Sequence, residues 1–183
     1  MILDLPLAHA SLDPDAAART TPGLLERLLG EADTAVVLVD ELGHLAVTGN
    51  SLDLVPARAH APDASTVHVH LGRTSDGRAR VLAIAPRDPA REYRDLRRIM
   101  AGMTPEDRGT AVPAVAIANW HHSHAHCPRC GRPTEVSAAG WVRVCPECGL
   151  DHYPRTDPAV IMAVTDQDGR LLLAHAAHFP AGR

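Results

Sequence analysis

Residues 126–161 of the chain read HCPRCGRPTEVSAAGWVRVCPECGLDHYPRTDPAVI and contain all four of its cysteines. The cysteines form two Cys-x-x-Cys pairs with fourteen residues between them: Cys127 and Cys130, then Cys145 and Cys148. This double spacing is typical of a structural zinc site, in which each pair forms a turn that brings two thiolates to the metal. Because sulfur fills all four tetrahedral positions, no position is open to water or substrate. We therefore expect a structural rather than a catalytic zinc ion.

The residues around the cysteines fit the same interpretation. A glycine, Gly131 or Gly149, directly follows the second cysteine of each pair, where a positive φ lets backbone N–H groups approach the sulfurs. Residues 141–144 (WVRV) are predicted as a strand that follows a turn at Gly140. Four thiolates around one divalent cation leave an excess of negative charge. Three arginines lie close enough in sequence to offset it: Arg129, Arg132 and Arg143.

Histidines near the cysteines are also potential zinc ligands. We favour positions at a helix end or on the surface for five of them, since the cysteines already complete a tetrahedral set: His121, His122, His124, His126 and His152. His68 and His70 share one face of a predicted strand. Neither a carboxylate nor a third histidine is near them in sequence, so they too are interpreted as structural. Two redox pairs, or four buried cysteines without metal, are the alternatives to zinc.

Length, composition and charge bound the class of protein. A chain of 183 residues that is 45 % apolar is sufficient for one medium domain or two small ones. The formal net charge of −4 provides no basic field for a nucleic-acid backbone, so DNA is not an expected partner. The N-terminus lacks the positive segment of a signal peptide, and no apolar run approaches the roughly 20 residues that span a membrane. We expect a cytoplasmic protein with no membrane partner, in a reducing compartment where clustered cysteines bind metal.

The rest of the chain predicts a mixture of helices and strands. Apolar runs joined by turn residues predict three β-hairpins: 35–40 with 44–48, 67–71 with 80–85, and 159–165 with 170–175. Cap signals and apolar periodicity predict three helices: from Thr21 and Pro22 to Gly30, from about Ala90 to Ala101, and from Thr104 and Pro105 towards the cysteines. Pro113 is expected to kink or divide the last helix.

Three segments resemble the NADH pyrophosphatase (NAD diphosphatase) branch of the Nudix hydrolases: ANWH (118–121), CPRCG (127–131) with the second cysteine pair, and YPRTDPAVI (153–161). The resemblance is clear from about residue 115 to residue 183, and its specificity comes from the zinc ribbon being followed at once by YPRTDPAVI. It implies an α+β fold in three parts. These are a mixed N-terminal domain over 1–118, a zinc ribbon over 122–155, and the first β-hairpin of a Nudix α/β/α domain over 156–183.

The resemblance also implies a function. Members of this family hydrolyse the pyrophosphate of NAD or NADH to nicotinamide mononucleotide and AMP, some remove NAD caps from RNA, and they are typically homodimers. The tyrosine of their Tyr-Pro-Arg motif and an apolar residue of the next strand help to form the nicotinamide pocket, and Tyr153 and Ile161 match these positions. Packing beside the ribbon is the alternative role for Tyr153. In the full-length family enzyme, Mg²⁺ or Mn²⁺ ions assist the attack of water on phosphorus.

The glutamates that hold these ions lie in a box: a glycine, a glutamate six residues later, and then Arg-Glu-x-x-Glu-Glu. No glycine of this chain has a glutamate at that distance, and no two glutamates are adjacent. We therefore expect a Nudix domain cut off before its box, without catalytic residues and inactive on NADH. The alternatives are a non-catalytic zinc-ribbon module for dimerisation or nucleotide binding, and an unrelated zinc ribbon that docks nucleic acid, which the charge disfavours.

Overall fold

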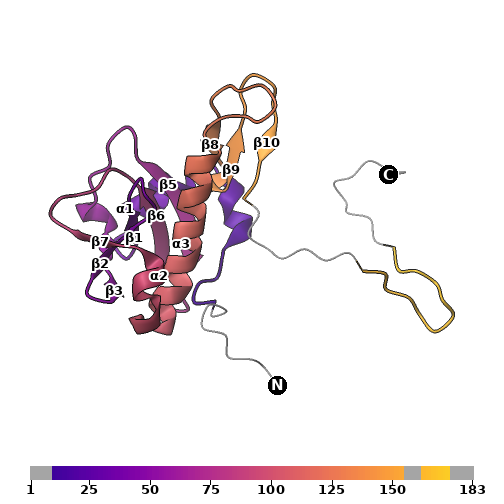
Figure 1. Cartoon of the computed structure of the whole chain (residues 1–183), viewed down its shortest axis with the longest axis horizontal. Coiled ribbons are helices and arrows are strands. Elements are labelled where there is room, and N and C mark those ends of the chain that lie inside the picture. Colours follow the sequence, from indigo (N-terminus) through magenta and orange to yellow (C-terminus); the bar gives the residue numbers. More distant parts are fainter. Residues whose placement is uncertain (1–9, 155–161, 174–183) are drawn as a thin grey trace.

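The computed structural model describes residues 10–154 and 162–173. The described chain is α+β: one large mixed sheet with helices on its faces, and one small antiparallel sheet in the cysteine-containing segment (Figure 1). The first part contains the 3₁₀ helix η1 (Ala16–Thr20), α1 (Leu24–Gly30), β1 (Ala35–Val39), β2 (Leu45–Thr48), β3 (Ser51–Leu52), β4 (Val55–Pro56), η2 (Ala57–Ala59), β5 (Val67–Arg73), β6 (Ala79–Ile84) and β7 (Glu92–Arg94). The second part contains α2 (Leu96–Ile99), η3 (Met100–Gly102), α3 (Pro105–Ser123), β8 (Glu135–Ser137), η4 (Ala138–Gly140), β9 (Val142–Val144) and β10 (Asp151–His152).

The large sheet has the strand order β3-β2-β1-β6-β5, with β4 paired to β1 and β7 paired to β2. The two hairpins predicted in this region are confirmed, because β1 pairs with β2 and β5 pairs with β6, both antiparallel. The two hairpins join side by side through β1 and β6, which run parallel from Ala35 opposite Arg80 to Val39 opposite Ile84. The carboxyl ends of two neighbouring strands therefore lie together at one end of the sheet.

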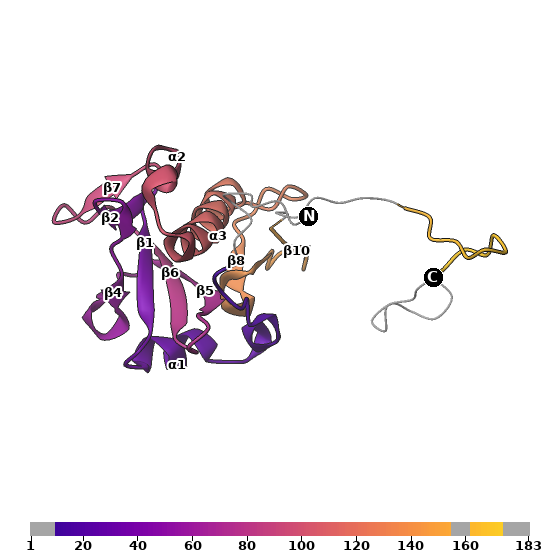
Figure 2. The same cartoon turned by 90° about the horizontal axis from the view of Figure 1, so that it is seen from below.

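Alternation along the strands gives the sheet two apolar faces. On one face, Val37 and Val39 of β1 join a cluster with Ala114 and Ile117 of α3. On the other face, Leu24 and Leu28 of α1 pack with Ala79 and Val81 of β6. Helices therefore cover both faces, and α3 extends past the sheet to the small sheet beyond the β5 edge, as the two views agree (Figures 1 and 2).

Helix α3 begins where the sequence predicts. Thr104 is the N-cap, and its hydroxyl oxygen accepts a hydrogen bond of 3.1 Å from the N–H of Asp107. Of the two outcomes expected at Pro113, a kink or a division, the division is wrong, since one helix runs from Pro105 to Ser123. Pro113 removes one backbone hydrogen bond, and the residue whose carbonyl its ring approaches is the small Gly109. The buried face of α3 on either side of Pro113 packs against the sheet and keeps the helix continuous.

The helix predicted from about Ala90 to Ala101 is wrong over its first half. Residues Glu92–Arg94 form strand β7, in which Tyr93 lies opposite Ala46 of β2. The side chain of Asp95 then caps the N–H of Arg97 and starts the short helix α2. Apolar residues spaced for a helix are thus drawn into the sheet by pairing with a strand that is remote in sequence. The helix after Thr21 starts at Leu24, because Gly23 has a left-handed φ of 70°, and it ends at Gly30 as predicted.

Residues 162–173 contain the turn of the third predicted hairpin. Asp166 accepts hydrogen bonds from the N–H groups of Asp168 and Arg170, and Thr165 forms an antiparallel bridge with Leu171. The outer ends of this hairpin lie outside the described residues. Met162 and Leu171–Leu173 expose their apolar side chains. Among the helices that the structure describes, none has the length and apolar character to cross a membrane.

Candidate metal centre

The four cysteines converge as their spacing predicts. Their sulfur atoms all lie within 4.8 Å of one another. The Sγ–Sγ distances are 3.7 Å from Cys127 to Cys148, 3.4 Å from Cys130 to Cys145, and 3.9 Å from Cys130 to Cys148. Four sulfurs at about 2.3 Å from zinc form a tetrahedron with edges of about 3.8 Å. The observed distances match those edges and are too long for disulfides, whose S–S bond is about 2.05 Å.

Backbone N–H groups stabilise negative charge on the sulfurs. Burial raises the pKa of the Cys127 thiol, but the N–H groups of Cys130 and Arg129 outweigh it, and the result is a lowered pKa. The N–H of Cys148 lowers the pKa of Cys145 to about 7. Gly131 and Gly149 have φ values of 73° and 67°, which confirms the left-handed turns expected after each pair.

The other two thiols show why a cation belongs here. The N–H of Arg132 acts to lower the pKa of the Cys130 thiol. The sulfurs next to Cys130 and its burial have the larger, opposite effect, and they raise the pKa to about 12. The pKa of Cys148 is also raised: the N–H of Leu150 acts to lower it, but the neighbouring Cys145 sulfur, burial and the Cys127 sulfur outweigh that effect. Charged sulfurs at these distances repel one another, and a divalent cation at their centre removes that repulsion. The residues present therefore fit a structural zinc ion with four thiolate ligands.

Strands β8, β9 and β10 form the ribbon that carries the cysteines. Val144 of the central strand β9 pairs with Glu135 of β8 on one side and with Asp151 of β10 on the other. At the end of the β8–β9 hairpin, η4 makes a tight turn in which Ala138 and Ala139 have φ values of 47° and 49° and Gly140 has a φ of 92°. The predicted turn at Gly140 and the predicted strand after it are both confirmed.

The turn η4 docks on the edge strand β5. A Cβ atom on Gly140 would lie 2.7 Å from the Cα of Val69 and 2.8 Å from the carbonyl oxygen of His68. The next residue, Trp141, donates from its indole Nε1–H to the carbonyl oxygen of His70 at 2.6 Å. The guanidinium of Arg19 stacks on the indole, 3.6 Å from the ring centroid. Residues from three separate parts of the chain thus fix the ribbon against the large sheet.

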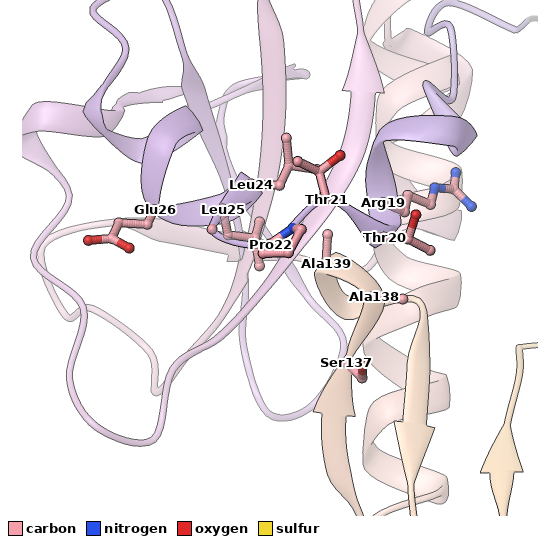
Figure 3. A pocket seen from close by; sticks show the side chains of 11 residues that line it. Arg19, Thr20, Thr21, Pro22, Leu24, Leu25, Glu26, Ser137, Ala138 and Ala139 are labelled. Atoms are coloured by element: carbon pink, nitrogen blue, oxygen red, sulfur yellow. The ribbon is translucent and has the colours of Figure 1, made fainter.

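A pocket of about 390 Å³ lies beside this junction (Figure 3). Figure 3 shows Ser137, Ala138 and Ala139 of the ribbon facing the start of α1, with Arg19 and Thr20 of η1 next to them. The residues that line it are small or aliphatic apart from Arg19, Glu26 and three hydroxyl side chains. The pocket therefore lies between the η1–α1 segment and the end of the β8–β9 hairpin.

A buried polar network holds the ribbon to α3. Nε2 of His121 lies 2.9 Å from the carbonyl oxygen of Gly140, so this nitrogen must carry the proton and donate. Nδ1 then accepts from Nη1 of Arg143 at 3.0 Å. Arg143 also donates to the hydroxyl and the carbonyl oxygen of Thr134, at 2.7 and 2.8 Å. Burial, followed by the nearby Arg143 charge, lowers the pKa of His121 to about 4 despite the Gly140 carbonyl, so the imidazole is neutral at pH 7.

The structure gives Arg143 a role that the sequence did not predict. We expected it to offset the thiolate charge, but its guanidinium hydrogen-bonds to Thr134 and His121 instead. Its network partners lie nine and twenty-two residues away in sequence. A histidine on the buried side of α3, within the WHH segment, is the one local signal for such a network.

The remaining histidines stand outside the four-sulfur cluster. The expected helix-end or surface position is wrong for His152, which is buried in strand β10. His124 hydrogen-bonds to Ser123 near the end of α3, while His122 and His126 are exposed. His152 is buried and its side chain acts on the Cys127 thiol, lowering its pKa. His68 and His70 of β5 have different partners. Nε2 of His68 lies 3.0 Å from Nε2 of His60, and Nε2 of His70 lies 3.2 Å from a carboxylate oxygen of Asp15.

Comparison with known proteins bears on this centre directly. Residues 122–153 match the model of the NADH pyrophosphatase zinc ribbon domain. The chain is 33 % identical over 174 residues to the NAD-capped RNA hydrolase NudC of Mycobacterium tuberculosis, an alignment that covers 92 % of this chain and 52 % of the relative. It is 36 % identical over 88 residues to the human mitochondrial NAD(P)H pyrophosphatase NUDT13, covering 48 % of this chain and 25 % of the relative.

These similarities support the NADH pyrophosphatase branch of the Nudix hydrolases as the family that this chain resembles. It spans about half the length of the mycobacterial relatives that it matches.

Of the two predicted substrate residues, the structure describes Tyr153, which lies near the end of the ribbon segment. Tyr153 follows β10 directly and is 60 % exposed. Its hydroxyl donates to a carboxylate oxygen of Asp151 at 3.1 Å, and this hydrogen bond raises the pKa of the phenol. An exposed ring argues against the alternative of a residue packed beside the ribbon. Ile161 lies outside the described residues.

Proposed function

We propose that this chain carries the N-terminal and zinc-binding parts of an NAD(H) diphosphatase, an enzyme that hydrolyses the NAD(H) pyrophosphate to nicotinamide mononucleotide and AMP. The observation that supports it most directly is the zinc ribbon. Its sequence matches that of the NADH pyrophosphatases, and its four sulfurs have the spacing of a zinc tetrahedron. In this proposal residues 1–118 form the N-terminal domain, 122–155 the ribbon, and 156–183 the beginning of the catalytic domain.

The zinc ion in this enzyme is structural and takes no part in the chemical step. Hydrolysis of a pyrophosphate needs divalent ions to neutralise the phosphate oxygens and a carboxylate to position the attacking water. In the proposed enzyme these are Mg²⁺ or Mn²⁺ and the glutamates of the Nudix box. The 183 residues contain no such set of glutamates. We therefore propose that this polypeptide does not hydrolyse NADH by itself.

Tyr153 and Ile161 are proposed to contact the nicotinamide end of the substrate in a homodimer. Tyr153 is well placed for such a contact, since its exposed ring stands where the chain leaves the ribbon. An exposed aromatic ring offers a flat apolar surface on which a base or a nicotinamide ring stacks. NAD-capped RNA is a proposed second substrate, given the activity in the name of the mycobacterial relatives. A cytoplasmic location is part of the same proposal.

Two measurements test the proposal. The zinc-loaded 183-residue polypeptide is incubated with NADH and Mg²⁺, and nicotinamide mononucleotide and AMP are quantified by chromatography; we expect no turnover. Release of both products would overturn the proposed inactivity. The coding DNA beyond the codon for Arg183 is then read in all three frames. A glycine-led box ending in Arg-Glu-x-x-Glu-Glu is expected there.

NADH titration distinguishes the runner-up function, a non-catalytic nucleotide-binding or dimerisation module. Saturable binding of NADH to the 183 residues, combined with unrelated sequence beyond Arg183, would favour the module over the enzyme. If Tyr153 contributes to binding by stacking, Tyr153→Ala weakens it while Tyr153→Phe retains it.

A further inference from the structure

A second pocket, here called the strand-end pocket, opens where β1 and β6 end. It has a volume of about 260 Å³. Glu41 follows β1, and Ile84, Ala85 and Pro86 are the last residue of β6 and the two after it. The two strands are parallel neighbours, with Val39 opposite Ile84, so both chains reach the pocket with their carboxyl ends. Open sheets that contain parallel strands bind ligands preferentially at this end.

The walls of the strand-end pocket are partly apolar and partly polar. Val67 of β5 joins Ile84, Ala85 and Pro86 in the apolar part. The polar part contains Ser65 and Glu41, which are exposed at the rim, and three residues from outside the large sheet: His121, His122 and Arg143. Arg143 comes from the ribbon and the histidines from the end of α3. The docked ribbon therefore contributes one wall of the pocket, through Arg143.

Arg143 is the unusual component of this pocket. It is only 8 % exposed, and a guanidinium keeps its charge at all ordinary pH values. Its three hydrogen bonds go to uncharged groups, Thr134 and His121, and no ion pair joins it to a carboxylate within the part of the chain that the structure describes. A buried charge without a counter-charge is unfavourable, and an anion next to it relieves that cost.

The guanidinium also has donors to spare. It carries five N–H groups, of which its three hydrogen bonds use three. Neighbouring N–H groups of a guanidinium match the two oxygens of a carboxylate or phosphate, and such charge-assisted pairs are among the stronger polar contacts. His121 does not compete for the anion as a second charge, because it is neutral at pH 7 and accepts from Arg143.

We propose that the strand-end pocket binds a small molecule with a single carboxylate or phosphate group on an apolar body, its oxyanion paired with Arg143 and its body against Val67 and Ile84. The size and charge of the site set the class of ligand. A volume of about 260 Å³ is below the range of about 300 to 1,000 Å³ that holds drug-sized ligands, so a whole dinucleotide does not fit. Glu41 and the carbonyl end of α3 oppose further negative charge. This site is separate from Tyr153 and independent of the proposed hydrolase function.

Three probes that differ in one group test the proposal: benzoate, phenyl phosphate and neutral benzyl alcohol. Each is titrated into the zinc-loaded chain while amide and arginine side-chain signals are followed by NMR. We expect saturable shifts for at least one anion, centred on Val67, Ala85, His122 and Arg143, and at least tenfold weaker binding of benzyl alcohol. The tighter anion identifies the group. Equal binding of the alcohol, or no saturable shift in the pocket with any anion, would overturn the proposal.

Substitutions of the exposed rim residues Glu41 and Ser65 test the pocket without removing the hydrogen bonds of Arg143 to Thr134 and His121. Glu41→Gln removes the opposing charge and should tighten anion binding about two- to fivefold, whereas Glu26→Gln, the same change on α1 and outside the pocket, should have no effect. Ser65→Trp fills the opening from an exposed position and should abolish binding. Arg143→Gln should weaken it at least tenfold if zinc content and circular dichroism show an intact fold. Unchanged affinity in both rim variants would refute the site even if Arg143→Gln does not fold.

Discussion

Gly140→Ala should loosen the ribbon from the large sheet. Gly140 combines a left-handed φ of 92° with close approach to β5. An added Cβ would meet Cγ2 of Val69 at 2.6 Å, its Cα at 2.7 Å and the carbonyl oxygen of His68 at 2.8 Å. Real Cβ contacts are not this short, and two of the three atoms belong to the backbone of a strand. The strand cannot yield as a flexible side chain would, so the turn η4 must move away.

The size of the effect follows from two separate costs. The left-handed conformation costs alanine about 1 to 2 kcal/mol. Forcing an additional carbon into a packed contact costs about 1 to 3 kcal/mol more. Gly77→Ala provides a matched control, since Gly77 has a φ of 84° and no atom within 4 Å of the added Cβ. Both substitutions restrict the unfolded chain equally. The difference between them, about 1 to 3 kcal/mol, therefore measures the contact with β5.

Urea unfolding of the zinc-loaded variants measures this difference. Far-ultraviolet circular dichroism follows the sheets, and tryptophan fluorescence follows Trp120 and Trp141, of which Trp141 donates to His70 next to the clash. We expect Gly140→Ala to lower the free energy of unfolding more than Gly77→Ala and to shift the emission of the native state. If the two variants agree within about 0.5 kcal/mol, a difference usual for ordinary surface substitutions, the docking of η4 on β5 is not as close as described.

Three further predictions concern buried groups. Burial lowers the pKa of His121 from its ordinary value of 6.5 to about 4 in the folded chain, so the stability that its neutral form contributes is full above pH 6.5 and is lost as the pH falls towards 4. The wild type should therefore exceed His121→Gln in free energy of unfolding by less at pH 4 than at pH 7. Urea titrations should show this difference shrinking by up to about 3 kcal/mol. Asp40→Asn should lower the free energy of unfolding by about 1 to 3 kcal/mol, measured by thermal unfolding, because this buried carboxylate accepts hydrogen bonds from Leu42, His44 and Arg87. Asp88→Asn, at a more exposed carboxylate, should lower it by less. Cys145→Ser, or a chelator, should abolish binding of one zinc per chain and change the tryptophan emission of the chain.

The sequence predicts the metal centre well because the information is local. Each Cys-x-x-Cys turn places its own two sulfurs, and the glycine after it supplies the left-handed residue that the turn requires. The paired strands β1 with β2 and β5 with β6 are likewise separated by short turns. Local patterns fail where a distant strand decides the structure. Tyr93 has helical spacing with its neighbours but pairs with Ala46, forty-seven residues earlier in the chain.

The parts of the site that sequence reasoning missed are all long-range. The parallel pairing of β1 with β6 is not marked by a short turn in the sequence. It nevertheless brings together the strand ends that line the strand-end pocket. Arg143 lies two residues from a zinc ligand, which favours a role at the thiolates in any local analysis. The direction of its guanidinium depends on Thr134 and on His121 of a different element. These contacts cannot be inferred from the spacing of residues along the chain.

These contacts also indicate what the large sheet does for the ribbon. The ribbon has little apolar core of its own, since Val136 and Leu150 are exposed, and a small sheet of this kind needs a metal or a docking partner for stability. Zinc fixes the end that carries the cysteines, and η4, held between β5 and Arg19, fixes the opposite end. Between them, Arg143 ties β9 to α3. Since η4 and Arg143 join the ribbon to β5 and α3, these two elements set the position from which the chain leaves β10 at Tyr153.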